Sequence, residues 1–300
     1  MKKQYNFESK FKLANIISIF LVMGSLLLIF FKGLNFGIDF KGGTLIELRV
    51  DSKNIGISDV RSSFSNMSLG DINVKEFGSK GDYLIKFEKK TFNDNNNIKK
   101  IKENVKNSLQ SEVNFRRVEN VGPKVSAELL NSGLLAISLA LGAMLFYIWV
   151  RFEWQFSVGS ILAIFHDVLV TIGLFSLLSL EINLSIVAAV LTIVGYSMND
   201  TVVIYDRIRE NLSKFSSIKI GEISNISINE TLSRTIITSA TTLLALISIF
   251  VLGGEILRGF ALAMIIGVII GTYSSIFVAS PILKYLNVNY KTIAKEKENI

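Results

Sequence analysis

The chain has 300 residues, of which half are hydrophobic and only 19% are charged. This balance is too apolar for an ordinary soluble domain and indicates membrane spans. The chain contains no cysteine, which excludes disulfides, thiolate metal sites and thiol nucleophiles. Its formal net charge of +7 would suit a nucleic-acid-binding protein, but the basic residues gather in the loops between apolar segments, which argues against that class.

Six stretches of the chain are long and apolar enough to cross a bilayer. A spanning helix needs about 20 mostly apolar residues to cross roughly 30 Å of hydrocarbon. The segment 32–132 has no such stretch and is expected to lie in water. The pattern therefore predicts a membrane all-α bundle of six transmembrane helices with one inserted aqueous domain. The candidate spans lie near 13–31, 133–150, 157–180, 184–204, 236–252 and 259–283.

The basic residues predict how these spans are oriented. Lysine and arginine are frequent in 1–12, in the loop near 205–235 and in the tail 284–300, which share one side if six spans alternate. The short loops on the other side, 181–183 and 253–257, carry neither residue. By the positive-inside rule both termini are cytoplasmic and the inserted domain is extracytoplasmic. The first span starts like a signal peptide, but its full length and its lack of a cleavage site predict an uncleaved anchor.

Within the inserted domain, alternating apolar residues predict strands and helical spacing of apolar residues predicts helices. The predicted elements follow in the order β-α-β-β-α-β, which is the order of the ferredoxin-like split unit. We therefore expect an α+β ferredoxin-like extracytoplasmic domain. One fold serves many functions, so the pattern does not predict what this domain binds. The predicted strands are 44–50, 72–77, 83–88 and 113–118, and the predicted helices are 58–64 and 94–109.

Asp200 stands out because an ionisable side chain inside lipid is costly, by roughly 3 kcal/mol on insertion scales. It lies in the fourth span, on the cytoplasmic side of the centre, with Tyr196, Ser197 and Asn199 within about one turn. Desolvation and a nearby cation would compete over its charge, and that competition suits a group that takes up and releases a proton. The alternative is an interhelical polar lock that never changes charge.

Two further polar sites lie in the predicted spans. Arg234 begins the fifth span, ahead of threonines and serines that could line a hydrated path, but at that position it could also extend to the headgroups. His166 and Asp167 lie near the middle of the third span. This pair could relay protons or form a satisfied structural pair, because adjacent helix residues point about 100° apart. A single histidine without cysteine is too little for a metal site.

Glycines mark two places in the chain. The segment 37–44 is glycine-rich but lacks the lysine position of a phosphate-binding loop. It is better explained as a strained junction from the first span into the first strand, where glycines relieve the turn. In the last span, the glycines that bound 267–271 have the spacing of close helix packing. The junction motif comprises Gly37, Asp39, Gly42 and Gly43.

Several segments together carry a family resemblance: 36–44, Arg151–Trp154, His166–Asp167, Gly195–Asn211 and Arg234–Thr242. In this order they resemble the SecF family of bacterial protein-export subunits, and the similarity extends over essentially the whole chain. The resemblance implies a role in late protein export with a SecD-like sister subunit, a SecY-type channel and translocating preproteins as partners. It implies a place among the lipids of the bacterial cytoplasmic (inner) membrane. It implies no enzymatic activity and no cofactor, with protons as the coupling ion.

In that family, the aspartate matching Asp200 and the arginine matching Arg234 are regarded as proton-path residues. The wider resemblance is to resistance-nodulation-division exporters, whose fourth span has paired aspartates; the first of that pair is Asn199 here. A relay on this chain therefore has one carboxylate at that site, and the sister subunit would supply another. We hypothesise that protonation of Asp200, coupled with Arg234, shifts the bundle and swings the outer domain. His166 and Asp167 are further candidates for the proton path.

Three alternatives stay open at this point. The chain could be a structural partner that holds the export complex together without energy coupling. It could be a small-molecule or lipid exporter of the resistance-nodulation-division type, although such proteins usually join two six-span halves and carry larger outer domains. It could be an intramembrane aspartyl protease that uses Asp167 and Asp200, although the Gly-x-Gly-Asp arrangement of such enzymes is absent.

Overall fold

The computed structural model describes residues 4–52, 55–67, 69–88, 95–215 and 217–297. The chain divides into two compact units. The helical unit comprises residues 1–35, 136–180 and 185–300, and the sheet unit comprises residues 36–135 and 181–184. Residues 1–3 and 298–300, at the two ends that we expect to be cytoplasmic, lie outside the described residues, as does residue 94 at the start of one predicted helix.

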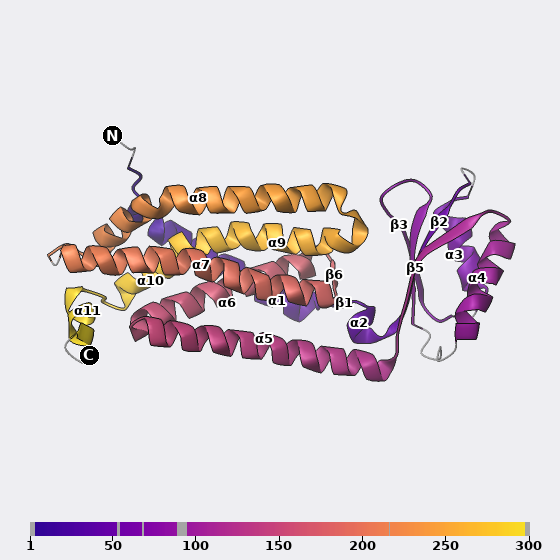
Figure 1. Cartoon of the computed structure of the whole chain (residues 1–300), viewed down its shortest axis with the longest axis horizontal. Coiled ribbons are helices and arrows are strands. Elements are labelled where there is room, and N and C mark those ends of the chain that lie inside the picture. Colours follow the sequence, from indigo (N-terminus) through magenta and orange to yellow (C-terminus); the bar gives the residue numbers. More distant parts are fainter. Residues whose placement is uncertain (1–3, 53–54, 68, 89–94, 216, 298–300) are drawn as a thin grey trace. The chain divides into compact units, whose positions relative to one another are not determined.

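Among the described residues, six helices are long and apolar enough to cross a membrane (Figure 1). Each includes most of one stretch that hydropathy predicts, so the chain is a multi-pass membrane protein. Short helices flank them at the two ends of the chain, η1 (Glu8–Lys10) and α11 (Tyr290–Lys297). The six are α1 (Phe11–Lys32), α5 (Pro123–Arg151), α6 (Trp154–Leu177), α7 (Leu184–Lys214), α8 (Ile220–Leu252), and α9 (Gly254–Ser274) continued by a π-helix, η2 (Ser275–Ala279), and by α10 (Ser280–Tyr285).

The loop predicted near 205–235 is helical over most of its length, because α7 and α8 both continue well beyond their apolar stretches. Polar side chains join the two extensions. The Asn211 amide donates to Ser227 Oγ at 3.0 Å and to Glu230 Oε2 at 2.7 Å. Arg207 Nε donates to the same Glu230 oxygen at 2.6 Å. Hydropathy detects only the apolar part of a helix, so it places the helix ends too early where such polar contacts extend the packing.

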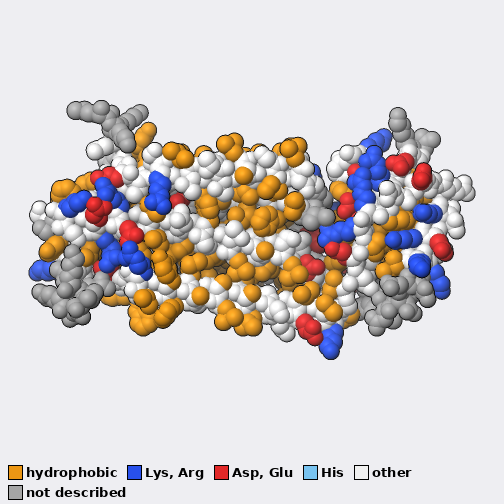
Figure 2. Space-filling view, viewed as in Figure 1, with side chains coloured by type: hydrophobic (Ala, Val, Ile, Leu, Met, Phe, Trp, Pro, Cys, Tyr) orange, Lys and Arg blue, Asp and Glu red, His pale blue; other side chains and the backbone are white. Residues whose placement is uncertain are grey.

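The helices of the helical unit differ in how much of their surface the unit itself covers. About half of the most apolar part of α6, of α7 and of the last span is buried inside the chain, but less than a fifth of that part of α1, α5 and α8. On the face shown in Figure 2, hydrophobic side chains cover the middle of this unit and charged side chains gather toward one end. The exposed apolar surface is the kind that lipid or another membrane helix covers. The interior of this unit therefore holds polar groups of α6, α7 and the last span, together with some of α8.

The sheet unit contains a four-stranded antiparallel sheet in the order β3-β4-β2-β5. Its elements follow one another along the chain as β2-α3-β3-β4-α4-β5. Ile46 lies at the centre of the sheet, opposite Ile85 on one side and Val118 on the other. A tightly packed core includes fully buried Ile46, Leu48, Val60, Phe64, Ile85 and Val105. The elements are β2 (Gly43–Val50), α3 (Ile57–Ser65), β3 (Ile72–Glu76), β4 (Asp82–Phe87), α4 (Asn95–Leu109) and β5 (Val113–Val121).

Short elements connect the first span to this sheet. The four-residue helix α2 (Ile38–Lys41) follows β1 (Asn35–Phe36), a short strand that pairs with β6 (Glu181–Ile182). The connection between α6 and α7 therefore runs beside the start of the sheet unit's own sequence. The predicted junction motif lies at this point.

Candidate functional site

Asp200 lies on the buried face of α7, together with Ser197, Thr201 and Ile204. Three- and four-residue spacing places these side chains on one side of the helix. Asp200 is only 2% exposed, and its Oδ2 atom has no hydrogen-bond partner among the described residues. A buried polar oxygen without a donor is costly, and more so when it is charged. Asp200 is therefore buried with one carboxylate oxygen that accepts no hydrogen bond from the described residues.

Arg234 lies on α8 at the level of Asp200. The Tyr196 hydroxyl donates to Ser239 Oγ at 3.4 Å on one side of this level, and the Arg207–Glu230 ion pair lies on the other. The two helices thus pack antiparallel, which brings Arg234 to the level of Asp200. Arg234 itself is exposed at the surface of the helical unit.

Asn199, a predicted site residue, and Thr235, the residue after Arg234, differ in how deeply they are buried. Asn199 is exposed, so the structure does not bring its amide into the interior beside the carboxylate. Thr235 follows Arg234 and is 1% exposed, and its Oγ1 atom also lacks a partner among the described residues. The facing surfaces of α7 and α8 thus hold two buried polar atoms without hydrogen bonds. Sequence reasoning noted the threonines of the fifth span but did not single out Thr235.

Asp167 is equally buried, but its carboxylate oxygens have hydrogen-bond partners. It is 1% exposed, and its Oδ2 atom accepts hydrogen bonds from Ser197 Oγ at 2.5 Å and from Ser274 Oγ at 2.7 Å. His166 Nδ1 lies 2.9 Å from the other carboxylate oxygen, so the two neighbours do meet despite their helical spacing. His166 Nε2 has no partner among the described residues. Asp167 therefore ties α6 to α7 and α9 in a closed network.

The π-helix η2 lies next to this network and was not predicted. Its first residue, Ser275, has its Oγ atom 2.9 Å from Thr201 Oγ1 on α7. Its last residue, Ala279, accepts a hydrogen bond at 2.9 Å from the hydroxyl of Tyr205, which is fully buried. A π-helix leaves carbonyl groups free of their usual partners, and here a side chain takes one of them. The signal in the sequence is Pro281 in the last span, which cannot donate a backbone hydrogen bond.

Gly267 and Gly271 of the last span allow α9 to pack against α7. A Cβ atom on Gly267 would lie 2.3 Å from Ile193 Cδ1, and one on Gly271 would lie 2.9 Å from Ser197 Cβ. Neither helix could approach this closely with a larger residue. The predicted close packing is confirmed, and it brings Ser274 within reach of Asp167.

The junction motif uses glycine for two different reasons. Gly42 and Gly43 have φ angles of +77° and +127°, which other residues rarely adopt. A Cβ atom on Gly43 would also lie 2.7 Å from the carbonyl oxygen of Phe87. Gly37 has an ordinary φ angle of −75°, but a Cβ atom there would lie 2.6 Å from the carboxylate of Glu181. The motif thus combines a sharp turn with close approach of neighbouring chain segments.

Polar contacts within the sheet unit complete this junction. The Asp39 carboxylate accepts a hydrogen bond at 2.9 Å from the backbone N–H of Leu184, the first residue of α7. A carboxylate at this end of a helix is stabilised by the free N–H groups and the helix dipole. Gly37 N–H donates to Ile182 O at 2.8 Å, and Glu181 forms an ion pair with Lys86 of β4. The predicted motif residues therefore hold residues 181–184 in place.

Comparison with known protein families identifies the chain. Residues 100–289 match the family model described as protein export membrane protein SecD/SecF, C-terminal. Residues 27–53, which contain the junction motif, match the SecD/SecF GG motif. The chain is 44% identical over 281 residues to protein translocase subunit SecF of Cereibacter sphaeroides, covering 91% of this chain and 86% of that protein. It is also 44% identical over 284 residues to the SecF subunit of Rickettsia bellii, covering 94% and 93%.

Solved structures agree with this relationship. The crystal structure of SecDF, a translocon-associated membrane protein from Thermus thermophilus, superposes with a TM-score of 0.85 at 35% identity. It matches 95% of this chain, which spans 39% of the solved chain. A structure of SecDF in its super-membrane-facing form gives a TM-score of 0.71 at 34% identity, covering 100% of this chain and 41% of the other. The chain thus spans about two fifths of each SecDF chain. It belongs to the SecF family of protein translocase subunits.

Proposed function

We propose that this chain couples the proton gradient across the bacterial cytoplasmic membrane to late steps of protein translocation, together with a SecD-like subunit and a SecY-type channel. The observation that carries the proposal is the contrast between two buried carboxylates. Asp167 accepts three close contacts, whereas Asp200 is just as buried and has an oxygen without a donor. Protonation removes a costly charge at Asp200 and disturbs a satisfied network at Asp167.

Arg234 gives Asp200 two distinguishable states. In this proposal the charge of Arg234, which lies at the same level, stabilises the ionised carboxylate, and the burial of Asp200 stabilises its neutral form. A proton moved through a potential of 100 mV supplies roughly 2.3 kcal/mol, and a few kcal/mol shifts a two-state equilibrium strongly. We infer that proton uptake at Asp200 weakens its attraction to Arg234 and so changes the packing of α7 against α8.

The expected orientation and partners follow from the same proposal. The distribution of lysine and arginine supports cytoplasmic termini and an outer sheet unit. The strand order and the chain order of the elements support a ferredoxin-like fold for that unit. Asn199 offers an amide on the exposed surface of α7, where a second subunit could pack. The SecDF chains are longer than this chain, which supports a SecD-like sister subunit as its partner.

The test is export of a secreted precursor in cells whose only copy of this chain carries Asp200→Asn. This change removes the charge and keeps the size of the side chain. Asp206→Asn is the matched control, because it is the same substitution six residues along α7 at an exposed ion pair with Arg151. We expect Asp200→Asn to slow export and to abolish its dependence on the gradient, and Asp206→Asn to leave both unchanged.

Membrane levels and co-purification of the SecD-like subunit separate coupling from assembly. Slow export with normal levels and normal co-purification supports energy coupling through Asp200. Loss of co-purification would instead support the second candidate, a structural subunit without coupling, which the closed Asp167 network favours. Normal gradient-dependent export by Asp200→Asn at normal levels would refute the coupling proposal.

A further inference from the structure

Strand β5 forms one end of the four-stranded sheet in the sheet unit, and among the described residues it pairs only with β2. Its outer edge therefore presents backbone N–H and C=O groups that no neighbouring strand takes up. Such an edge is a template for pairing with another extended chain. Proteins usually protect an edge of this kind unless it has a partner.

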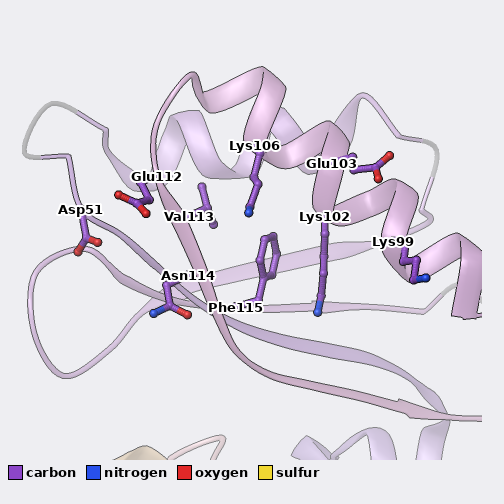
Figure 3. A pocket seen from close by; sticks show the side chains of 9 residues that line it. All are labelled: Asp51, Lys99, Lys102, Glu103, Lys106, Glu112, Val113, Asn114 and Phe115. Atoms are coloured by element: carbon purple, nitrogen blue, oxygen red, sulfur yellow. The ribbon is translucent and has the colours of Figure 1, made fainter.

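Helix α4 runs beside this edge and leaves a pocket of about 530 Å³ between the two (Figure 3). The four lining residues on α4 lie at positions 99, 102, 103 and 106, which is the spacing of residues on one face of a helix. Phe115 lies at the centre of the lining in Figure 3, with Lys102 and Lys106 reaching toward it from the helix. Lys102 Nζ lies 5.3 Å from the centre of the Phe115 ring. The lining residues are Asp51, Lys99, Lys102, Glu103, Lys106, Glu112, Val113, Asn114 and Phe115.

The pocket lining holds three lysines and three carboxylates, and the lysines, with Glu103 among them, lie on the helix side. Three of the four lining residues on the helix are lysines, and none of these lysines forms an ion pair within the described part of the chain. Asp51 and Glu112 lie together at the other end of the pocket in Figure 3. Val113 and Phe115 supply an apolar surface between the helix and the strand. The helix side of the pocket is thus suited to an anionic group, beside an apolar surface and an open strand edge.

We propose that the groove between α4 and β5 binds an extended, acidic polypeptide segment as an added strand. A groove between a helix and a sheet edge is one of the general arrangements that bind peptides by strand addition. Backbone hydrogen bonds to β5 supply affinity, and alternate side chains of the segment face the lysines of α4. That the segment belongs to an exported chain rests on the function proposed above.

Peptide binding to the purified full-length chain in nanodiscs tests the groove directly. The probe is a short fluorescent peptide of alternating glutamate and valine, titrated by anisotropy. We expect Lys102→Glu to raise its Kd about tenfold, because the variant replaces an attraction with a repulsion. Lys106→Glu should act in the same direction while keeping the contact between Lys102 and Phe115. Lys100→Glu is the matched control, since Lys100 is exposed on the same helix but does not line the pocket.

Two altered peptides test the mode of binding. A peptide with lysine in place of glutamate should bind at least about tenfold more weakly, because it meets like charge. A peptide with proline at alternate positions should also lose binding, because proline cannot donate the backbone hydrogen bonds of an added strand. Absence of binding to the unaltered chain, or equal binding by all three lysine variants, would overturn the proposal.

Cross-linking identifies the occupant in membranes. The chain has no cysteine, so Lys99→Cys places a single thiol in the groove, and Lys75→Cys places one on β3 at the opposite edge of the sheet. We expect disulfides from Lys99→Cys, and not from Lys75→Cys, to cysteines of a translocating precursor. Cross-links from Lys99→Cys to the SecD-like subunit alone would overturn the proposal and assign the groove to a subunit contact. The peptide titration needs no gradient, so it gives its answer whether or not Asp200→Asn slows export.

Discussion

Replacing Asp167 with alanine should destabilise the helical unit much more than replacing Asp200 with alanine. Both substitutions remove a carboxylate that is at most 2% exposed, so the loss of buried volume is the same. Only the Asp167 substitution removes the acceptor of two interhelical hydrogen bonds, from Ser197 and Ser274. The Asp200 substitution removes an oxygen that has no donor. The difference in unfolding free energy between the two variants therefore measures the loss of the hydrogen bonds, without the effect of the cavity.

The size of the difference follows from the hydrogen bonds. Interhelical hydrogen bonds in a membrane protein average about 0.6 kcal/mol, which sets a lower bound near 1 kcal/mol for two of them. The Ser274 hydroxyl can still donate to the carbonyl of Gly271, but an unsatisfied Ser197 hydroxyl in a dry interior adds about 1–3 kcal/mol, which sets the upper bound. We expect the free energy of unfolding to fall by about 2–4 kcal/mol more for Asp167→Ala than for Asp200→Ala. At about 2–4 °C per kcal/mol, Tm should differ by at least about 4 °C.

Tryptophan fluorescence during thermal unfolding of the purified chain provides the measurement. The two tryptophans of the chain, Trp149 and Trp154, both lie in the helical unit, so the signal reports that unit and not the sheet unit. Asp167→Asn should lie between the wild type and Asp167→Ala, because its amide oxygen can still accept from the serines. Equal Tm values for Asp167→Ala and Asp200→Ala would refute the distinction between a satisfied and an unsatisfied carboxylate.

Two glycine substitutions test the close contacts. Gly271→Val should lower Tm of the helical unit, because its side chain would meet Ser197, whereas Gly24→Val should not, because no atom lies within 4 Å of a Cβ there. Gly43→Ala should lower the stability of the sheet unit by roughly 1–3 kcal/mol, because it combines a positive φ angle with a clash at Phe87. The sheet unit should then be cleaved faster in limited proteolysis. Unchanged melting or unchanged proteolysis would contradict the corresponding contact.

The long apolar helices could be predicted from the sequence because a spanning helix must satisfy its own backbone and present apolar side chains to lipid. The strands of the sheet unit could be predicted because one face alternates into a core around Ile46 and Ile85. The turn at Gly42 and Gly43 could be predicted because few other residues adopt their φ angles. Each of these features depends on residues that are near one another in the sequence.

The contacts between spans could not be predicted in the same way. Asp167 and Asp200 are both carboxylates in neighbouring spans, and the serines that donate to Asp167 alone, Ser197 and Ser274, lie on two other helices. Ser274 reaches Asp167 because Gly271 permits a close approach, which depends on how two distant segments pack. The hydrogen bond from Tyr205 of α7 to Ala279 in the last span likewise depends on how distant segments pack. Pairings across more than seventy residues leave no periodic signal in one sequence.

The arrangement of the two carboxylates also bears on the direction in which a proton at Asp200 could move the bundle. Ser197 lies one turn before Asp200 on α7 and is held by Asp167, and its carbonyl oxygen accepts hydrogen bonds from Thr201 and Ser275. This side of α7 is therefore anchored to α6 and to the last span. At this level α8 is linked by Ser239 to Tyr196 of α7 and to Thr272 of the last span, and less than a fifth of its most apolar part is buried. Under the proposed coupling, a change of charge at Asp200 meets resistance toward Asp167 and least resistance toward Arg234, so α8 is the helix that should move.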